Sequence, residues 1–137
     1  DPGAEIVKLA HEKDIRVIPL VGPSSIILAM MASGFNGQNF AFNGYLPIDT
    51  SERKAAIKNL ERLSKEKNQS QIFIETPYRN EKMLTDLKST LTPTAKLCVA
   101  CDITLQSEYI RTLEINDWKN ENPDLQKRPT IFIIHKE

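Results

Sequence analysis

The chain has 137 residues, 40% of them hydrophobic, and its 18 basic and 18 acidic side chains cancel to a formal net charge of zero. This length suits one domain with a real core, and the charge balance argues against a surface given over wholly to a polyanion. No apolar run approaches the roughly 20 residues of a membrane span, and nothing resembles a secretion signal. We therefore expect no membrane partner, and the reduced, buried cysteines described below suit a cytoplasmic protein.

The first elements along the chain are expected to be a helix, a strand and a second helix. Residues 4–13 have the apolar spacing of an amphipathic helix, and the run 16–20 predicts a buried strand. Residues 26–32 are apolar all round, which is typical of a helix packed on both sides. Ser33-Gly34 is a signal for the end of that helix.

The rest of the chain alternates strands with helices and then ends in strands. The expected elements are a short aromatic strand at 40–42, a helix at 51–67 capped by Thr50 or Ser51, a strand at 71–75, a helix at 80–91, strands at 96–101 and 108–115, a short helix around Trp118 and a final strand at 130–135. This order predicts an α/β fold: a three-layer α/β/α domain with a mixed, mainly parallel sheet.

The most informative stretch is Val-Gly-Pro-Ser-Ser at 21–25, between the expected strand 16–20 and helix 26–32. A turn from a strand into a helix leaves backbone N–H groups and short hydroxyls facing outward, where they can hold a ligand. The alternative is a plain turn in which one serine caps the helix.

Cys98 and Cys101 form a Cys-x-x-Cys pattern inside an expected strand. Residues three apart on a strand point to opposite faces and lie about 10 Å apart, too far for a disulfide or a shared metal. The two histidines, His11 and His135, have no metal-ligand spacing. We expect reduced cysteines and no metal site.

Glu75 and Arg79 flank Pro77 at the junction between an expected strand and helix. Glu75 is suited to orient or deprotonate a substrate hydroxyl, and Arg79 to hold a phosphate. The alternative is an ion pair that braces the turn. A basic stripe on the helix 51–67 likewise has two interpretations, a solvated face or a contact with an RNA backbone; its members are Lys54, Lys58, Arg62 and Lys65.

Four stretches, in order, resemble the tetrapyrrole (corrin/porphyrin) methylase superfamily. Asp1-Pro2-Gly3 is similar to its Asp-Pro-Gly turn, and residues 21–25 to its Pro-Gly-x-Ser-Ala loop, with Val21 in place of proline. Phe-Ala-Phe-Asn-Gly-Tyr-Leu-Pro at 40–47 and Phe-Ile-Glu-Thr-Pro-Tyr-Arg at 73–79 resemble motifs of the branch that methylates ribose 2′-hydroxyls of ribosomal RNA.

The resemblance implies a methyltransferase that uses S-adenosylmethionine as methyl donor and holds it between two domains. Its cofactor contacts fall here on Ser24 and Ser25, and on strand-end positions that match Ile74, Ala100 and Thr130. It implies that residues 1–35 end an N-terminal domain and contain the hinge and cofactor loop, and that 36–137 form the C-terminal methylase domain. The chain is then a fragment, expected to be inactive in isolation.

The resemblance also favours catalytic roles for Glu75 and Arg79, a ribosomal RNA acceptor, and a homodimer. Beyond residue 100 the match to the RNA branch weakens, because Cys101 and Leu105 stand where that branch has Arg and Lys, and Arg-Pro-Thr at 128–130 where it has Lys-Gly-Glu. Two alternatives therefore stay open: methylation of a corrin, porphyrin or other small molecule, and a non-catalytic dimerisation domain with the same fold.

Overall fold

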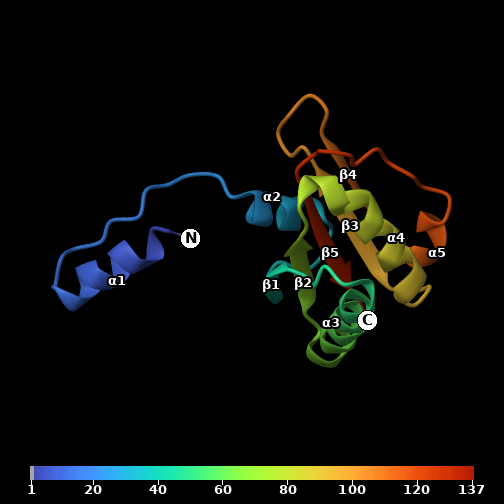
Figure 1. The fold of residues 1–137 in the computed structure, drawn as a ribbon, viewed down its shortest axis with the longest axis horizontal. Coiled ribbons are helices and arrows are strands. Elements are labelled where there is room, and N and C mark those ends of the chain that lie inside the picture. The colour runs from blue at the N-terminus through green and yellow to red at the C-terminus, as the bar shows by residue number, and fades with distance from the viewer. Residues whose placement is uncertain (1) are drawn as a thin grey trace.

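From residue 25 onward, helices and strands follow one another in the order that the sequence pattern predicts (Figure 1). The structure, a computed structural model, describes residues 2–137, so Asp1 of the Asp-Pro-Gly motif lies outside the described residues. Its elements are α1 (Ala4–Glu12), α2 (Ser25–Ala32), β1 (Phe40–Tyr45), α3 (Thr50–Lys67), β2 (Ser70–Ile74), the 3-10 turn η1 (Pro77–Arg79), α4 (Asn80–Thr90), β3 (Lys96–Cys101), β4 (Tyr109–Glu114), α5 (Ile115–Trp118) and β5 (Thr130–His135).

Within residues 2–137 the strands form one mixed sheet in the order β1-β2-β5-β3-β4. The α/β class and the mixed sheet are confirmed, but the prediction of a mainly parallel sheet is wrong, since three of the four pairings described are antiparallel. The helical crossovers α3 and α4 do give β1, β2 and β3 a common direction. However, β5 returns between β2 and β3, antiparallel to both, and β4 folds back on β3 as a hairpin.

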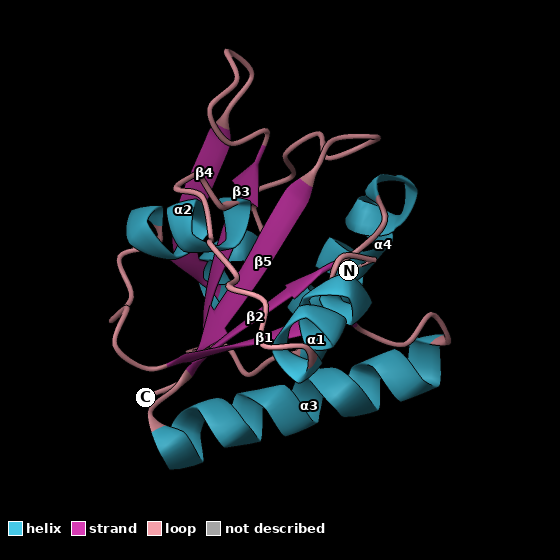
Figure 2. Cartoon of the chain, turned by 90° about the vertical axis from the view of Figure 1, so that its left-hand side faces the viewer, coloured by secondary structure: helices cyan, strands magenta, loops and turns pink. Residues whose placement is uncertain are grey.

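Helices cover both faces of this sheet, which gives the predicted three layers (Figure 2). On one face, apolar residues of α3, α4 and α5 pack on Phe73, Leu97 and Phe132. On the other, α2 packs Ala29 and Met30 on the sheet. Alternation along β3 sends Cys101 to the first core and Cys98 to the second, and both thiols are free and buried. The prediction that the two cysteines occupy opposite faces is confirmed.

The N-terminal arm, residues 2–24, lies away from the sheet (Figure 1). Helix α1 forms as predicted, but none of its residues is buried. The predicted strand at 16–20 is absent from the described structure, where Ile18 is 62% and Leu20 90% exposed. A strand needs a neighbour for its backbone hydrogen bonds, and the described residues place none beside this segment. An apolar run is therefore not enough to form a strand when no neighbouring strand pairs with it.

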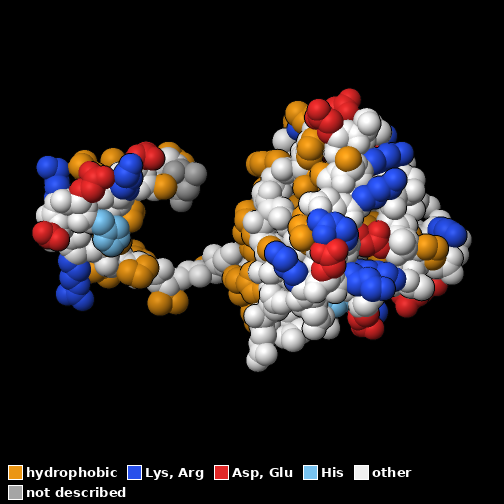
Figure 3. Space-filling model, turned by 90° about the horizontal axis from the view of Figure 1, so that it is seen from below, with side chains coloured by type: hydrophobic (Ala, Val, Ile, Leu, Met, Phe, Trp, Pro, Cys, Tyr) orange, Lys and Arg blue, Asp and Glu red, His pale blue; other side chains and the backbone are white. Residues whose placement is uncertain are grey.

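Helix α2 packs on one side only, whereas its uniform apolarity predicted packing on both. Met30 is 3% exposed, while Met31, next in the sequence, is 75% exposed. Figure 3 shows hydrophobic side chains gathered along the side of the body from which the arm leaves. The outer face of α2 is thus an apolar surface without a cover among residues 2–137.

Helix α3 begins one residue earlier than expected and is capped by Asp49, not by Thr50 or Ser51. The Asp49 carboxylate accepts a hydrogen bond from the backbone N–H of Glu52 at 3.0 Å. Its buried face carries Arg53, Ile57, Leu60 and Ser64, so a charged residue occupies one of the inward positions. Within residues 2–137, no helix combines the length and the hydropathy that a membrane-spanning segment requires.

Candidate functional site

A cavity of about 390 Å³ opens at one edge of the sheet, where several segments meet. Strands β2 and β3 end there, and β5, which runs the opposite way, begins there. Ligands of open α/β sheets commonly bind at the carboxyl ends of strands. The predicted cofactor residues Ser25, Ile74, Ala100 and Thr130 all line this cavity, although they come from four separate segments.

The cavity wall is mostly apolar, with a few polar groups. Ile74, Pro77, Ile103 and Leu105 are among its apolar residues, and its polar residues are Ser25, Glu75, Asp102 and Thr130. No lysine or arginine of the described chain lines it. A concave, apolar site of several hundred Å³ with few polar groups is typical of small-molecule and cofactor sites.

The serine turn meets the cavity at the N-terminus of α2. Ser24 is the N-cap, in extended backbone conformation, and its hydroxyl makes no capping hydrogen bond in the described structure. Ser25 is the first helical residue and lines the cavity; Ser24 does not line it. The free N–H groups and the positive end of the helix dipole at this position favour an anionic group.

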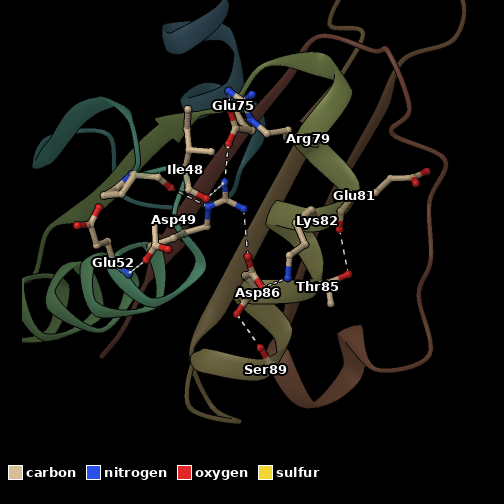
Figure 4. Close-up of polar contacts among 12 residues, drawn as sticks. Ile48, Asp49, Glu52, Glu75, Arg79, Glu81, Lys82, Thr85, Asp86 and Ser89 are labelled. Carbon is tan, nitrogen blue, oxygen red and sulfur yellow. Dashed lines mark hydrogen bonds and ion pairs between the residues drawn. The ribbon is translucent and has the colours of Figure 1, made fainter.

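Glu75 lines the cavity and also belongs to a buried ion network (Figure 4). Its Oε2 accepts from Arg53 at 3.0 Å, and its Oε1 lies 3.2 Å from Arg79 and accepts from the backbone N–H of Thr76 at 2.6 Å. Arg53 also donates to Asp86 at 3.1 Å, and Asp86 pairs in turn with Lys82 at 2.9 Å. Both oxygens of Glu75 are therefore engaged, which supports the bracing interpretation of the Glu75–Arg79 pair.

Arg53 and Asp86 are the members of this network that the sequence interpretation missed. From the sequence, Arg53 is expected to be one of the exposed charges of an amphipathic helix, because Arg and Asp are rarely fully buried. The available signal was its spacing, since Arg53 lies four residues before Ile57 and seven before Leu60 on the buried face. Its carboxylate partners lie 22 and 33 residues further on, beyond the reach of a local pattern.

The segment that contains Glu75 and Arg79 also carries unpaired polar atoms. Within residues 2–137, neither Thr76 Oγ1 nor Arg79 Nε has a hydrogen-bond partner, although both atoms are buried. Buried polar groups are nearly always paired, so each exception calls for an explanation. This segment is therefore a stronger candidate for ligand contact than its sequence alone indicated.

Arg128 ties two walls of the cavity together. Its Nε donates to Asp102 Oδ2 at 2.8 Å, and its other nitrogens donate to the backbone oxygens of Asp124 and Ser107. Ser107 Oγ donates to the same Asp102 oxygen at 2.8 Å. The hydrogen bonds from Arg128 and Ser107 hold the pKa of Asp102 below its ordinary value. One guanidinium thus fixes the loop after β3 against the loop before β5.

The basic stripe of α3 faces solvent and is partly neutralised. Arg62 pairs with Glu66 at 2.6 Å, with both side chains more than half exposed. Glu61, on the same helix, binds the backbone N–H of Thr92 at 3.1 Å. These contacts support the solvated-face interpretation. In the part of the chain that the structure describes, no three His, Cys, Asp or Glu side chains gather as metal ligands do.

The chain is similar in sequence to bacterial proteins named ribosomal RNA small subunit methyltransferase I, while no known family profile matches it. It is 28% identical to the protein of Vibrio cholerae over 98% of this chain and 46% of the relative. Identity to the protein of Haemophilus influenzae is 31% over 98% of this chain and 47% of the relative. The chain spans about half the length of the curated relatives it matches.

Several solved structures of methyltransferases share the fold of this chain. The methyltransferase CobJ superposes with a TM-score of 0.58 at 18% identity, over 99% of this chain and 61% of that chain. Uroporphyrin-III-C-methyltransferase from Thermus thermophilus superposes with a TM-score of 0.55 at 15% identity, over 99% of this chain and 58% of that chain. The α/β fold of the chain is that of these methyltransferases.

Proposed function

We propose that the protein carrying this chain is an S-adenosylmethionine-dependent methyltransferase of the tetrapyrrole methylase superfamily, and that the cavity at the sheet edge holds part of the cofactor. The observation that carries the proposal is the convergence of Ser25, Ile74, Ala100 and Thr130 on one cavity. A structure of Thermus thermophilus uroporphyrin-III C-methyltransferase contains S-adenosyl homocysteine, and it superposes with a TM-score of 0.50 at 12% identity over 98% of this chain.

The residues of the cavity suit such a cofactor. Its apolar wall can pack on the adenine ring, and the α2 N-terminus at Ser24 and Ser25 favours a carboxylate. When bound, S-adenosylmethionine supplies a methyl group on a positively charged sulfur, and its transfer depends mainly on alignment with the acceptor. The chain's contribution is then a dry, shaped wall and fixed main-chain groups, which a cavity without metal ligands can provide.

For Glu75 and Arg79 we propose a division of labour. Glu75 has both oxygens engaged and 2% side-chain exposure, so it acts by holding Arg79. Arg79 is 39% exposed and is the member suited to contact an anionic group of the acceptor. In the full-length protein, Glu75→Gln should raise the KM for the acceptor more than it lowers kcat. A loss of about 10²-fold in kcat alone would instead indicate a general base.

The acceptor that we propose is a ribose hydroxyl of ribosomal RNA, on the strength of the sequence similarity over 98% of the chain. A second candidate is a corrin, porphyrin or other small molecule, favoured by a cavity lining that contains no lysine or arginine among the described residues. Transfer of a radiolabelled methyl group to ribosomal RNA or to uroporphyrinogen III by the full-length protein distinguishes the two.

We further propose that the protein is a homodimer in which the outer face of α2 is covered. Ile27 and Met31 of that face are 45% and 75% exposed. Exposed apolar patches of this kind commonly mark interaction sites. Light scattering of the full-length protein should give twice the chain mass, and Met31→Lys should shift it toward the monomer. Without detectable methyl transfer, the same dimer would favour the non-catalytic dimerisation domain.

A further inference from the structure

The turn η1 places an exposed aromatic ring beside the cavity. Tyr78 is 71% exposed, whereas Pro77 before it lines the cavity and Arg79 after it pairs with buried Glu75. The turn is therefore fixed on both sides of the ring. Tyr78 thus presents an exposed aromatic ring one residue away from the cavity wall.

A cation is held against this ring by the loop before β5. Lys127 Nζ lies 5.8 Å from the centre of the Tyr78 ring. The backbone N–H of Lys127 donates to the Pro77 carbonyl at 3.2 Å, which fixes the loop on η1. Lys127 has a φ of +56°, a left-handed conformation that is uncommon for a lysine. Strained positions of this kind cluster at functional sites.

The ion network adds positive charge on the same side. It contains the cations Arg53, Arg79 and Lys82 against the carboxylates Glu75 and Asp86, so one positive charge is left over. The carboxylates are 2% exposed and Arg53 1%, whereas Arg79 and Lys82 are 39% and 53% exposed. Toward solvent, the network therefore presents cations and hides its anions.

We propose that Tyr78, Lys127 and Arg79 form a stacking platform for one nucleotide of a single-stranded RNA segment, with the base on the Tyr78 ring and the phosphates on the two cations. The inference rests on the proposed function, since the platform borders the proposed cofactor cavity. Unpaired RNA bases are recognised by stacking on aromatic side chains, with cations along the backbone. An open ring suits a base that belongs to a longer chain, whereas a tetrapyrrole needs a site that encloses most of its surface.

The test uses the full-length protein and a fluorescein-labelled single-stranded RNA of mixed sequence, with binding followed by fluorescence anisotropy. Tyr78→Ala should weaken binding about 5- to 100-fold, the range for loss of one stacked base, and Tyr78→Phe should retain it. Lys127→Ala should lower the slope of log affinity against log salt concentration by about 1. Lys119→Ala is the matched control, because Lys119 follows α5 at the opposite end of the sheet.

Calorimetric binding of S-adenosylhomocysteine separates failure of the platform from failure of the proposed function. The platform predicts that Tyr78→Ala leaves this affinity unchanged. If S-adenosylhomocysteine binds but RNA affinity is the same in wild type, Tyr78→Ala and Lys127→Ala, the platform is wrong and the methyltransferase proposal stands. If S-adenosylhomocysteine does not bind the wild-type protein, the proposed function itself fails. Loss of uroporphyrin binding in Tyr78→Ala, with RNA affinity unchanged, would overturn the choice of RNA.

Discussion

Replacing Arg53 by methionine removes the cation at the centre of the buried ion network. Arg53 donates to Glu75 and Asp86, and also to the backbone oxygens of Pro47 and Ile48 at 2.9 and 3.3 Å. Methionine fills much of the same volume but donates no hydrogen bond. Two carboxylates that are 2% exposed then lose their shared partner.

The expected cost follows from what the carboxylates retain. Removing one partner of a buried ion pair typically costs about 3–5 kcal/mol. In the variant, Glu75 still pairs with Arg79 and Asp86 still pairs with Lys82. We therefore expect a loss in the free energy of unfolding at the lower end of this range, about 3 kcal/mol. With an unfolding entropy of about 2.1 cal/mol/K per residue over 137 residues, this loss lowers Tm by roughly 10 °C.

The assay is urea and thermal unfolding of the chain, followed by the fluorescence of its single tryptophan. Trp118 is 0% exposed and donates from Nε1 to the Leu97 carbonyl at 2.9 Å, so its emission reports the core directly. Arg62→Met is the matched control, since the exposed Arg62–Glu66 pair should be worth less than about 0.5 kcal/mol. An Arg53→Met chain as stable as Arg62→Met would show that the buried network around Arg53 does not stabilise the fold.

Two further predictions concern the cavity rim and the sheet end. Arg128→Gln should weaken S-adenosylhomocysteine binding by the full-length protein about tenfold, or ~1.4 kcal/mol, because the loops after β3 and before β5 lose their shared donor; an unchanged calorimetric Kd would show that the clamp is irrelevant to the cavity. Burial lowers the pKa of His135, so the unfolded chain takes up its proton first as the pH falls below about 6.5. The contribution of His135 to the free energy of unfolding is therefore largest at pH 7 and declines toward pH 5. His135→Gln should flatten the dependence of the urea midpoint on pH over that range. An equally steep profile in the variant would show that His135 is not the group responsible.

The positions of the helices and strands were largely predictable from local patterns. The strands 96–101 and 130–135 were predicted with the bounds that the structure has, because short apolar runs between turn residues define them. The order of strands in the sheet was not predictable in this way. The local sequence of β5 does not indicate that this strand lies between β2 and β3, because strand pairing depends on the topology of the whole sheet.

The candidate site shows the same division between local and long-range information. Ser25, Ile74, Ala100 and Thr130 were predicted through the family resemblance, and the structure brings them to one cavity. The role of Arg53 depends on two partners far along the chain, so no local pattern revealed it. The prediction of a strand at 16–20 was wrong for a related reason. A strand forms only where another strand pairs with it, and that partner is not visible in the local sequence.

The proposed site for S-adenosylmethionine in the full-length protein is the cavity at the sheet edge. Calorimetric titration with S-adenosylhomocysteine, performed on the wild type and on Ser25→Trp, is the decisive experiment for this proposal. We expect saturable binding to the wild type, and loss of binding in Ser25→Trp with an unchanged unfolding transition, because the indole fills the cavity from the α2 N-terminus. Binding that is equally tight in both proteins, or absent from a folded wild type, would contradict the claim.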